Sequence, residues 1–277
     1  MRNGRDCAGF RFRSNVDKLV RCLQQISEDG YNVKEVVKGG SLGKGTATPD
    51  SDIDLVVYLN GLRSIQDLED ARPDLKRLIK SAIKHSTFSH QIEWKKGTTF
   101  AVKCRMNGTG VDILPAFDVL GELGTPAAVY KSMKRYPGGP DEAADQYSAS
   151  LTKLQRNFVR KTDSTVKGAT RMLKEWSKEN DVDISSYCLE LVAIYVDSRN
   201  PDLSQEDLFR KCMGRLANCH ALCIAFDEYY DSDRYTRYMD APYILDPANP
   251  YKDTLEHADW KEVSRDANAY FREDNYY

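Results

Sequence analysis

The sequence predicts an α+β fold in two lobes, a mixed α/β lobe over residues 1–147 and a helical lobe over residues 148–277. Three observations lead to this prediction. A strongly apolar strand candidate, IDLVVYL at 53–59, lies between two amphipathic helix candidates. Short strand candidates joined by Lys-Gly and Asn-Gly turns follow at 91–114. Beyond them the apolar residues recur with the helical period. Clefts between lobes are common substrate sites, so we expect the active site there.

In the first lobe, apolar residues at helical spacing predict a helix over residues 14–29. A Gly-rich loop and the strand at 53–59 follow. A second helix is expected over 64–84, with Ser64 as its N-cap and Pro73 interrupting it. The later strand candidates are 91–95, 98–106 and 110–114.

The stretch 124–147 contains several Gly and Pro residues, which predict a loop-rich connection and the lobe boundary. The last predicted helix is a candidate to pack back on the first lobe. Helices are expected at 148–161, 164–180, 186–197, 204–229 and 258–272, with a loop containing ILDPANP at 244–250.

Composition describes an ordinary globular chain of 277 residues with a net charge of −2 and 41% hydrophobic residues. No stretch approaches 18 apolar residues, so we expect no membrane span. The first residues, MRNGRDCAGFRFRS, lack the apolar core of a secretory signal. Seven irregularly spaced cysteines favour reduced thiols, and hence a cytoplasmic or nuclear location.

The charges are unevenly distributed along the chain. Residues 153–178 carry eight Lys or Arg against two acids, and residues 1–47 carry nine against five. Residues 227–277 carry thirteen acids against six bases. Two basic stretches in a nearly neutral chain indicate a localised anionic partner, although solvated helix faces would give the same pattern.

The segment VVKGGSLGKGTATPDSDIDLVVYLNG at 36–61 resembles a phosphate-binding loop but fails the P-loop pattern. That pattern needs four residues between its glycines and a Ser or Thr after the lysine. Here three residues separate Gly39 from Gly43, and Gly45 follows Lys44. We therefore expect the metal ligands to come from elsewhere, while the glycines allow the backbone to approach a triphosphate and Ser41 offers its hydroxyl group.

The candidate metal ligands are three aspartates. Asp52 and Asp54 flank Ile53 at the start of a strand, so their carboxylates point to the same face. Asp112 lies within the apolar strand GVDIL, where a carboxylate is costly unless it is paired or metal-bound. A turn would also explain Asp52 and Asp54, but three such acids can hold two Mg²⁺ ions for phosphoryl transfer. Asp118 is more simply explained as a turn or helix-cap residue.

Several longer motifs of the sequence resemble those of one protein family. EVVKGGSLGKGT, SDIDLVVYL and VDILPAFDVLG resemble segments of the 2′-5′-oligoadenylate synthetases, within the polymerase-β-like nucleotidyltransferase superfamily. LQRNFVRK, RMLKEW, YCLELVAIY, LCIAFDEYYD and PYILDPANP follow in the same order. The resemblance is collinear over roughly residues 14–272 and implies a polymerase-β-like catalytic lobe followed by a helical lobe.

The resemblance implies roles for individual residues. Asp52, Asp54 and Asp112 would be catalytic Mg²⁺ ligands, with two ions expected. The implied ATP-binding residues, which bind phosphates or substrate ATP, are Gly40, Ser41, Arg171, Lys174, Ser186 and Tyr187. The positions that match double-stranded RNA contacts, or couple the RNA to the active site, are Lys38, Lys44, Arg156 and Arg160.

Several departures from the family pattern stand out. Ser186 replaces a glutamine that contacts ATP, and Thr165 replaces a basic RNA contact. The spacer from Lys44 to Asp52 and the connections around 104–112 and 130–150 are shorter than in the family pattern. This indicates an invertebrate or early-branching member.

The resulting hypothesis is an enzyme that polymerises ATP, and other NTPs to some extent, into 2′-5′-linked oligoadenylates and releases pyrophosphate. We expect stimulation by double-stranded RNA in antiviral-type innate immune signalling. The alternatives are a transferase that makes cyclic dinucleotides or mixed oligonucleotides, and a catalytically weak RNA-binding sensor. No zinc is expected, because Cys212, Cys219, His220 and Cys223 lie on one predicted helix, which cannot direct all four to one centre.

Overall fold

The computed structural model describes residues 14–273. The chain forms two compact units, which are described separately: Met1–Thr125 with Gln146–Lys153, and Pro126–Asp145 with Leu154–Tyr277. The lobe boundary predicted at residues 147 and 148 stays a prediction, and the expectation of no secretory signal concerns residues outside the described range. Within residues 14–273, no helix has the length and apolar character needed to span a bilayer.

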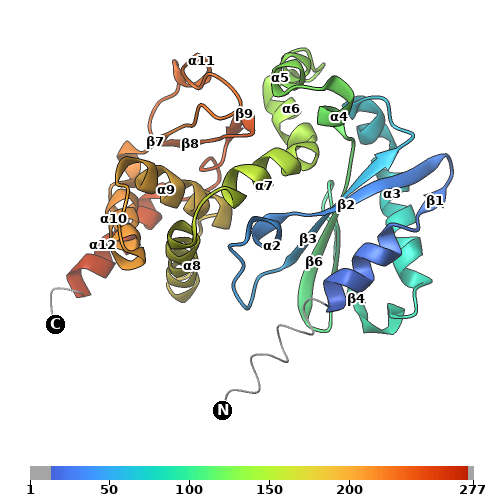
Figure 1. Ribbon diagram of the computed structural model, residues 1–277, viewed down its shortest axis with the longest axis horizontal. Coiled ribbons are helices and arrows are strands. Elements are labelled where there is room, and N and C mark those ends of the chain that lie inside the picture. The colour runs from blue at the N-terminus through green and yellow to red at the C-terminus, as the bar shows by residue number, and fades with distance from the viewer. Residues whose placement is uncertain (1–13, 274–277) are drawn as a thin grey trace. The chain divides into compact units, whose positions relative to one another are not determined.

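The first unit is built around a six-stranded sheet with the strand order β1-β2-β3-β6-β5-β4 (Figure 1). β3 and β6 are parallel, and the other neighbouring pairs are antiparallel, so the sheet is mixed as predicted. The strands are β1 (Ser27–Glu28), β2 (Tyr31–Lys38), β3 (Ile53–Asn60), β4 (Ile92–Trp94), β5 (Val102–Met106) and β6 (Thr109–Ala116).

The sequence analysis predicted β3 correctly but missed β2 and misplaced the end of the first helix. The helix ends at residue 23 rather than 29, and β1 follows. β2 alternates charged and apolar residues only partly, and all of its residues except Val37 are exposed or half-exposed. Its pairing with β3 therefore defines it as a strand more than its own pattern does.

α3 (Ile65–Lys84) is continuous through Pro73, so the predicted interruption is wrong. Ser64 caps the helix as expected, because its side chain accepts a hydrogen bond from the backbone N–H of Asp67 at 3.0 Å. Pro73 lies on the exposed face. The helix buries six apolar side chains, which offsets the lost backbone hydrogen bond: Ile65, Leu68, Leu75, Leu78, Ile79 and Ile83.

The two faces of β3 have different neighbours. Ile53, Leu55 and Val57 point to one face and are fully buried. On the other face Val56 and Tyr58 pack in a small apolar cluster with Val37, Ala116 and their neighbours. The Tyr58 hydroxyl group donates to the backbone oxygen of Ser150 at 3.2 Å, in the 3₁₀ turn η2 (Ala149–Leu151). Asp54 shares the face of this cluster, one residue from the start of the strand.

The stretch predicted as a loop-rich connection is largely helical. α5 (Pro126–Lys134) and α6 (Gly139–Ser148) occupy it, and α4 (Val119–Leu123) directly precedes it. Pro126 and Pro140 lie in the first turns of α5 and α6, where the missing N–H would have no intrahelical partner. The prolines therefore begin helices here instead of marking a loop.

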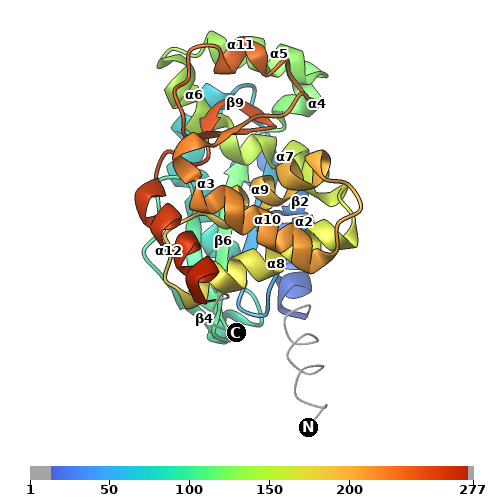
Figure 2. The ribbon, with the colours of Figure 1, turned by 90° about the vertical axis from the view of Figure 1, so that its left-hand side faces the viewer.

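Helices dominate the second unit. α8 and α9 pack on α10, and α12 also packs on α10, as both ribbon views show (Figures 1 and 2). Their apolar faces form a core cluster that includes Leu173, Leu191 and Leu208. The helices are α7 (Thr152–Arg160), α8 (Ser164–Glu179), α9 (Ser186–Arg199), α10 (Gln205–Ala217), α11 (Asp233–Thr236) and α12 (Trp260–Glu273).

The prediction that this region is wholly helical is wrong. The helix predicted over 204–229 ends at Ala217, and Cys219 and Cys223 lie in a 3₁₀ turn (η3, Cys219–Ala221) and in β7 (Cys223–Ile224). The predicted ILDPANP loop is a hairpin in a three-stranded sheet of order β7-β8-β9, with β8 at Tyr243–Asp246 and β9 at Asn249–Asp253.

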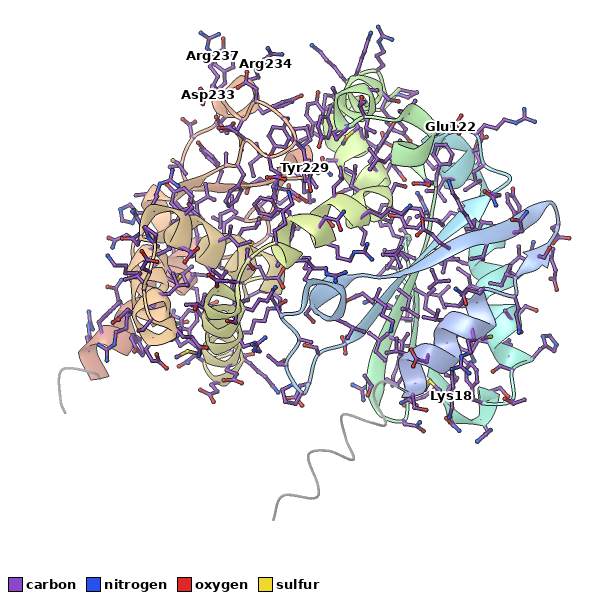
Figure 3. The ribbon with its side chains drawn as sticks, in the orientation of Figure 1. Lys18, Glu122, Tyr229, Asp233, Arg234 and Arg237 are labelled. Atoms are coloured by element: carbon purple, nitrogen blue, oxygen red, sulfur yellow. The ribbon has the colours of Figure 1, made fainter. Side chains whose placement is uncertain are left out.

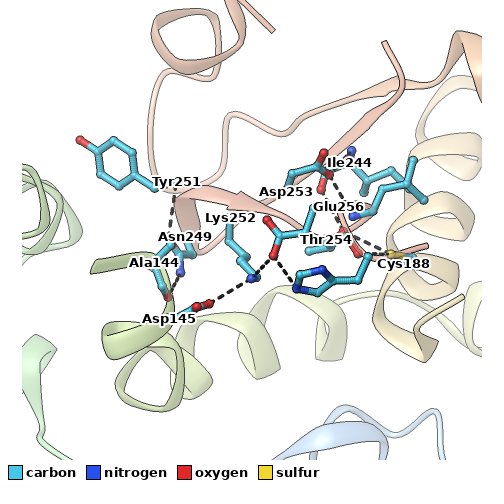
Figure 4. Close-up of polar contacts among 12 residues, drawn as sticks. Ala144, Asp145, Cys188, Ile244, Asn249, Tyr251, Lys252, Asp253, Thr254 and Glu256 are labelled. Carbon is cyan, nitrogen blue, oxygen red and sulfur yellow. Dashed lines mark hydrogen bonds and ion pairs between the residues drawn. The ribbon is translucent and has the colours of Figure 1, made fainter. Parts of the chain in front are cut away.

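Polar contacts anchor this hairpin to neighbouring helices (Figure 4). The Asn249 side chain donates to the backbone oxygen of Ala144 in α6 at 2.8 Å, and Lys252 pairs with Asp145 at 3.0 Å. The Cys188 thiol of α9 donates to the backbone oxygen of Thr254. These contacts come from side chains far apart in the sequence, which is why the hairpin could not be predicted from its own residues.

Candidate functional site

Three charged side chains form a row across the middle of the first sheet. Asp54 on β3 lies directly opposite Asp112 on the parallel strand β6. Lys103 on β5 lies directly opposite Asp112 on its other side. Directly opposed residues in a sheet point to the same face, so the order across the strands is Asp54, Asp112, Lys103. The Lys103 Nζ atom is 2.7 Å from the Asp112 Oδ2 atom.

Asp52 lies in the segment just before β3, with its carboxylate against Gly110. Asp52, Asp54 and Asp112 together are called the carboxylate row. A Cβ atom at Gly110 would lie 2.3 Å from the Asp52 Oδ1 atom, and a Cβ atom at Gly40 would lie 1.8 Å from the Asp54 Oδ2 atom. Gly40 also has a φ of +46°. Only glycine lets the backbone approach both carboxylates this closely.

The carboxylates repel one another. Burial, followed by the negative charges of Asp112 and Asp52, raises the pKa of Asp54 to about 6. The ammonium groups of Lys44 and Lys103 act in the opposite direction. The three carboxylates of Asp52, Asp54 and Asp112 lie close together on one face of the sheet. Their mutual repulsion favours the binding of a cation.

The donor set fits Mg²⁺ by its chemistry. Magnesium prefers carboxylate oxygens and is usually held by one or two of them together with water and substrate phosphates, not by an all-protein cage. Among residues 14–273, no three Asp, Glu, His or Cys side chains form a ready-made metal site. The carboxylates therefore fit as partial ligands, which a bound triphosphate would complete.

The segment predicted as a Gly-rich phosphate loop is a short helix, α2 (Gly40–Lys44), between the caps Gly39 and Gly45. The backbone N–H of Gly39 donates to the backbone oxygen of Asp54 at 2.8 Å, which attaches α2 to β3. Ser41, the predicted phosphate contact, is half-buried in this helix. The glycines serve the close approach to Asp54, and the expectation of a loop is wrong.

The second unit contains the other predicted ATP-binding residues. Lys174 in α8 is only 8% exposed, and its Nζ atom lies 2.8 Å from the Glu190 Oε1 atom in α9. Arg171, one helical turn earlier, is half-buried. Ser186 is exposed at the first position of α9, directly after the N-cap Ser185. Their roles in ATP binding stay predictions.

Tyr187 belongs to a hydrogen-bonded network around Asp246. Its hydroxyl group donates to the Asp246 Oδ1 atom at 3.0 Å, and the Gln155 side chain donates to Oδ2 at 2.6 Å. Burial, followed by the charge of Asp246, raises the pKa of Tyr187 well above its ordinary value. Asp246 is 1% exposed and also accepts from the backbone N–H of Ala248. It fixes the Tyr187 ring, and the sequence analysis did not single it out.

The predicted RNA-binding residues differ in exposure. Lys38 and Arg160 are exposed. The Lys38 Nζ atom lies 3.4 Å from the Asp17 Oδ1 atom. Lys44 is 7% exposed and its charge acts on Asp54, which fits coupling to the carboxylates better than direct contact with a duplex. Arg156 is half-buried, and its Nε atom is buried without a hydrogen-bond partner.

The acid-rich C-terminal stretch contains exposed bases as well. Arg234 and Arg237 project away from α11 (Figure 3). The Arg234 Nε atom pairs with the Asp231 Oδ2 atom at 2.9 Å, and Asp233 is adjacent. Nearby carboxylates thus neutralise part of this charge, so the segment is not a second basic surface.

Asp118 is the N-cap of α4, as the sequence indicated, and it does more than cap. Its carboxylate accepts from the backbone N–H of Gly121 and forms ion pairs with Lys34 at 2.7 Å and Lys153 at 3.1 Å. It is therefore a structural link in the first unit and not part of the carboxylate row.

Solved structures share the fold of this chain. CdnC of E. coli MS115-1, solved in complex with HORMA-deltaN, matches with a TM-score of 0.63 and 18% identity over 96% of this chain and 83% of its own. The Cid1 poly(U) polymerase with bound MgGTP matches with a TM-score of 0.61 and 16% identity over 98% and 90%. A nucleotidyltransferase-domain family model also matches residues 16–99. The fold and the carboxylates thus define a protein of the nucleotidyltransferase class.

The family follows from the second half of the chain. A family model described as 2'-5'-oligoadenylate synthetase 1, domain 2, C-terminus, matches residues 124–277, more than half of the chain. The chain belongs to the 2′-5′-oligoadenylate synthetase family. Human 2'-5'-oligoadenylate synthase 2 is 30% identical over 87% of this chain and 39% of its own length. Mouse 2'-5'-oligoadenylate synthase 1A is 28% identical over 90% and 77%. The chain spans about two fifths of the length of the first relatives that it matches, mouse and human 2'-5'-oligoadenylate synthase 2.

Proposed function

We propose that this protein transfers AMP from ATP to the ribose 2′-hydroxyl group of an acceptor nucleotide, and so makes 2′-5′-linked oligoadenylates with release of pyrophosphate. The observation that carries this proposal is the row of Asp54 and Asp112 on parallel strands, with Asp52 on the same face. The membership of the family adds the expected substrate and linkage.

The acceptor 2′-oxygen forms a bond to the α-phosphorus of ATP, and the bond from that phosphorus to the bridging oxygen of pyrophosphate breaks. The hydroxyl proton leaves to a carboxylate or to water, and pyrophosphate carries the electron pair away. Mg²⁺, two ions in the full proposal, would stabilise the developing charge and the leaving group. Asp52, Asp54 and Asp112 would hold the metal.

Other residues would position the substrate. Gly40 keeps the backbone of α2 against Asp54, and Ser41 offers a hydroxyl group to the donor phosphates. Arg171 and Tyr187 are the other proposed nucleotide contacts. Lys174 is held by Glu190, so its proposed contact with ATP requires either exchange of this partner or an indirect role through α8.

Stimulation by double-stranded RNA is part of the proposal. Lys38 and Arg160 are its best candidates for duplex contact, because both are exposed bases and phosphate contacts depend on charge and not on sequence. Lys44, beside Asp54, would link such a contact to the carboxylates. Family membership is the ground for proposing an antiviral-type signalling role, and the irregularly spaced cysteines are the ground for proposing a cytoplasmic location.

The deciding experiment compares wild type with Asp112→Ala and the control Glu93→Gln. Each protein is incubated with ATP and Mg²⁺, with and without duplex RNA, and the products are treated with a 3′-5′-specific nuclease and identified by mass spectrometry. Glu93 is an exposed carboxylate on the same sheet, paired with Lys95 outside the row. We expect nuclease-resistant adenylates from wild type and Glu93→Gln and none from Asp112→Ala.

Each product class tests a different part of the proposal. Products degraded by the nuclease, or cyclic products, would contradict the 2′-5′ linkage and leave nucleotidyl transfer intact. Transfer by Asp112→Ala at a near wild-type rate would contradict the carboxylate site. The absence of any product from every NTP, combined with RNA binding, would favour a catalytically weak sensor.

A further inference from the structure

We infer that Lys103 is a built-in competitor of the divalent cation: its ammonium group occupies one side of Asp112 and sets how much metal is needed to load the site. The inference rests on the proposed function of the carboxylate row. It concerns a residue that acts through Asp112, so Lys103 is a positioning residue and not a catalytic one.

The geometry of the sheet produces this competition. Lys103, Asp112 and Asp54 are directly opposed on three neighbouring strands, so backbone register holds their side chains on one face. The Lys103 Nζ atom donates to the Asp112 Oδ2 atom at 2.7 Å, a charge-assisted hydrogen bond. A metal ion bound by the same oxygen would have to displace this ammonium group or share the oxygen with it.

The charges of the neighbourhood support the same conclusion. The ammonium group of Lys103 carries a positive charge at neutral pH, as lysine ordinarily does, and pairs with Asp112 at 2.7 Å. Lys44 acts on Asp54 from the other end of the row. Three carboxylates and two ammonium groups give a formal charge of −1, which attracts Mg²⁺ less than three unopposed carboxylates would.

Both members of the pair remain reachable. The side chains of Lys103 and Asp112 are 37% and 27% exposed, so a hydrated cation and a solvated ammonium group can exchange at Asp112 without opening the core. A buried pair would resist exchange, because separating it would leave an unpaired buried charge. The partial exposure also means that salt should weaken the competition.

The test measures metal binding directly, without nucleotide. Mn²⁺ serves as the probe, because the free ion is observed by electron paramagnetic resonance, and Mg²⁺ binding follows from displacement of Mn²⁺. We expect Lys103→Met to tighten Mn²⁺ binding about fivefold, equivalent to about 1 kcal/mol. Lys103→Arg keeps the positive charge and should remain near wild type.

Two controls separate this effect from a general change of charge or stability. Lys161→Met removes a lysine of the second unit, which pairs with Glu228, and it should leave the Mn²⁺ affinity unchanged. In an Asp112→Asn background, Lys103→Met should lose most of its effect, because the competition acts through Asp112. Circular dichroism checks that each variant is folded.

A second readout uses stability. Metal that binds the folded chain raises the unfolding temperature according to its affinity, so Mg²⁺ at a fixed concentration should stabilise Lys103→Met more than wild type. Unchanged or weaker Mn²⁺ binding by folded Lys103→Met would overturn the inference. That result would leave the proposed function intact, since nucleotidyl transfer and its loss in Asp112→Ala are measured separately.

Discussion

Lys174 in α8 and Glu190 in α9 form an ion pair inside the helical unit, with 2.8 Å between Nζ and Oε1 and side chains that are 7% and 2% exposed. The pair joins two helices at their packed faces. A lysine predicted as a substrate contact is thus also part of the core, and substitutions must separate the two roles.

Lys174→Met should destabilise the protein by about 3–5 kcal/mol, because it leaves Glu190 buried without its cation. The double variant Lys174→Met/Glu190→Leu should recover most of that loss. Urea unfolding measures both. If the double variant recovers stability but retains a raised KM for ATP, Lys174 contacts the nucleotide; recovery of both shows a structural role alone.

Asp118→Asn should lower stability at neutral pH by about 1–2 kcal/mol, because it removes the ion pairs with Lys34 and Lys153. Asp74→Asn, which removes the exposed pair with Arg77, is the control and should change stability by less than about 0.5 kcal/mol.

The effect of Asp118→Asn should depend on pH in one direction. Burial tends to raise the pKa of Asp118, but hydrogen bonds from Lys34 and Lys153 outweigh it and hold the pKa below the ordinary value of 3.8. The stabilisation is therefore fully present above pH 3.8 and is lost as pH falls below that value through the folded-state pKa. Urea unfolding from pH 6 downwards should show the two proteins converging below about pH 4; a constant difference would contradict this assignment.

Lys38→Glu with Arg160→Glu should weaken binding of double-stranded RNA at all sequences alike and reduce the salt dependence of the binding constant. Both residues are exposed, so the fold should tolerate the change, whereas Arg156→Glu would reverse the charge at a half-buried position. Fluorescence anisotropy at several salt concentrations measures the effect. Arg77→Glu is an exposed control on α3, and equal losses from it would argue against a defined RNA surface.

Ser186→Gln should sharpen the preference for ATP over other NTPs by about fivefold in kcat/KM, the value of one added neutral hydrogen bond. The residue is exposed at the first position of α9, where a longer side chain fits without repacking. Ser198→Gln makes the same exchange near the other end of α9 and should have no effect. An unchanged NTP preference in Ser186→Gln would show that this position does not contact the base.

The sequence by itself determined the local elements and the family. The apolar run of β3 placed Asp52 and Asp54 on one face, Ser64 marked the start of α3, and the collinear motifs indicated a synthetase. Each of these depends on neighbours along the chain, where side-chain period and capping chemistry act directly. The elements it missed depend on distant partners: β2 needs β3 for its pairing, and β8 and β9 need α6 and α9.

Only the tertiary structure decided which charges meet. The parallel register of β3 and β6 puts Asp112 opposite Asp54, and the antiparallel register of β5 puts Lys103 opposite Asp112. A shift of either register by one residue would turn these side chains to the other face. Packing of α8 on α9 likewise buried Lys174 against Glu190. Strand register and helix packing are fixed by the whole core. The sequence therefore predicted the three aspartates and Lys174 as site residues, but it did not predict that Lys103 pairs with Asp112 or that Glu190 pairs with Lys174.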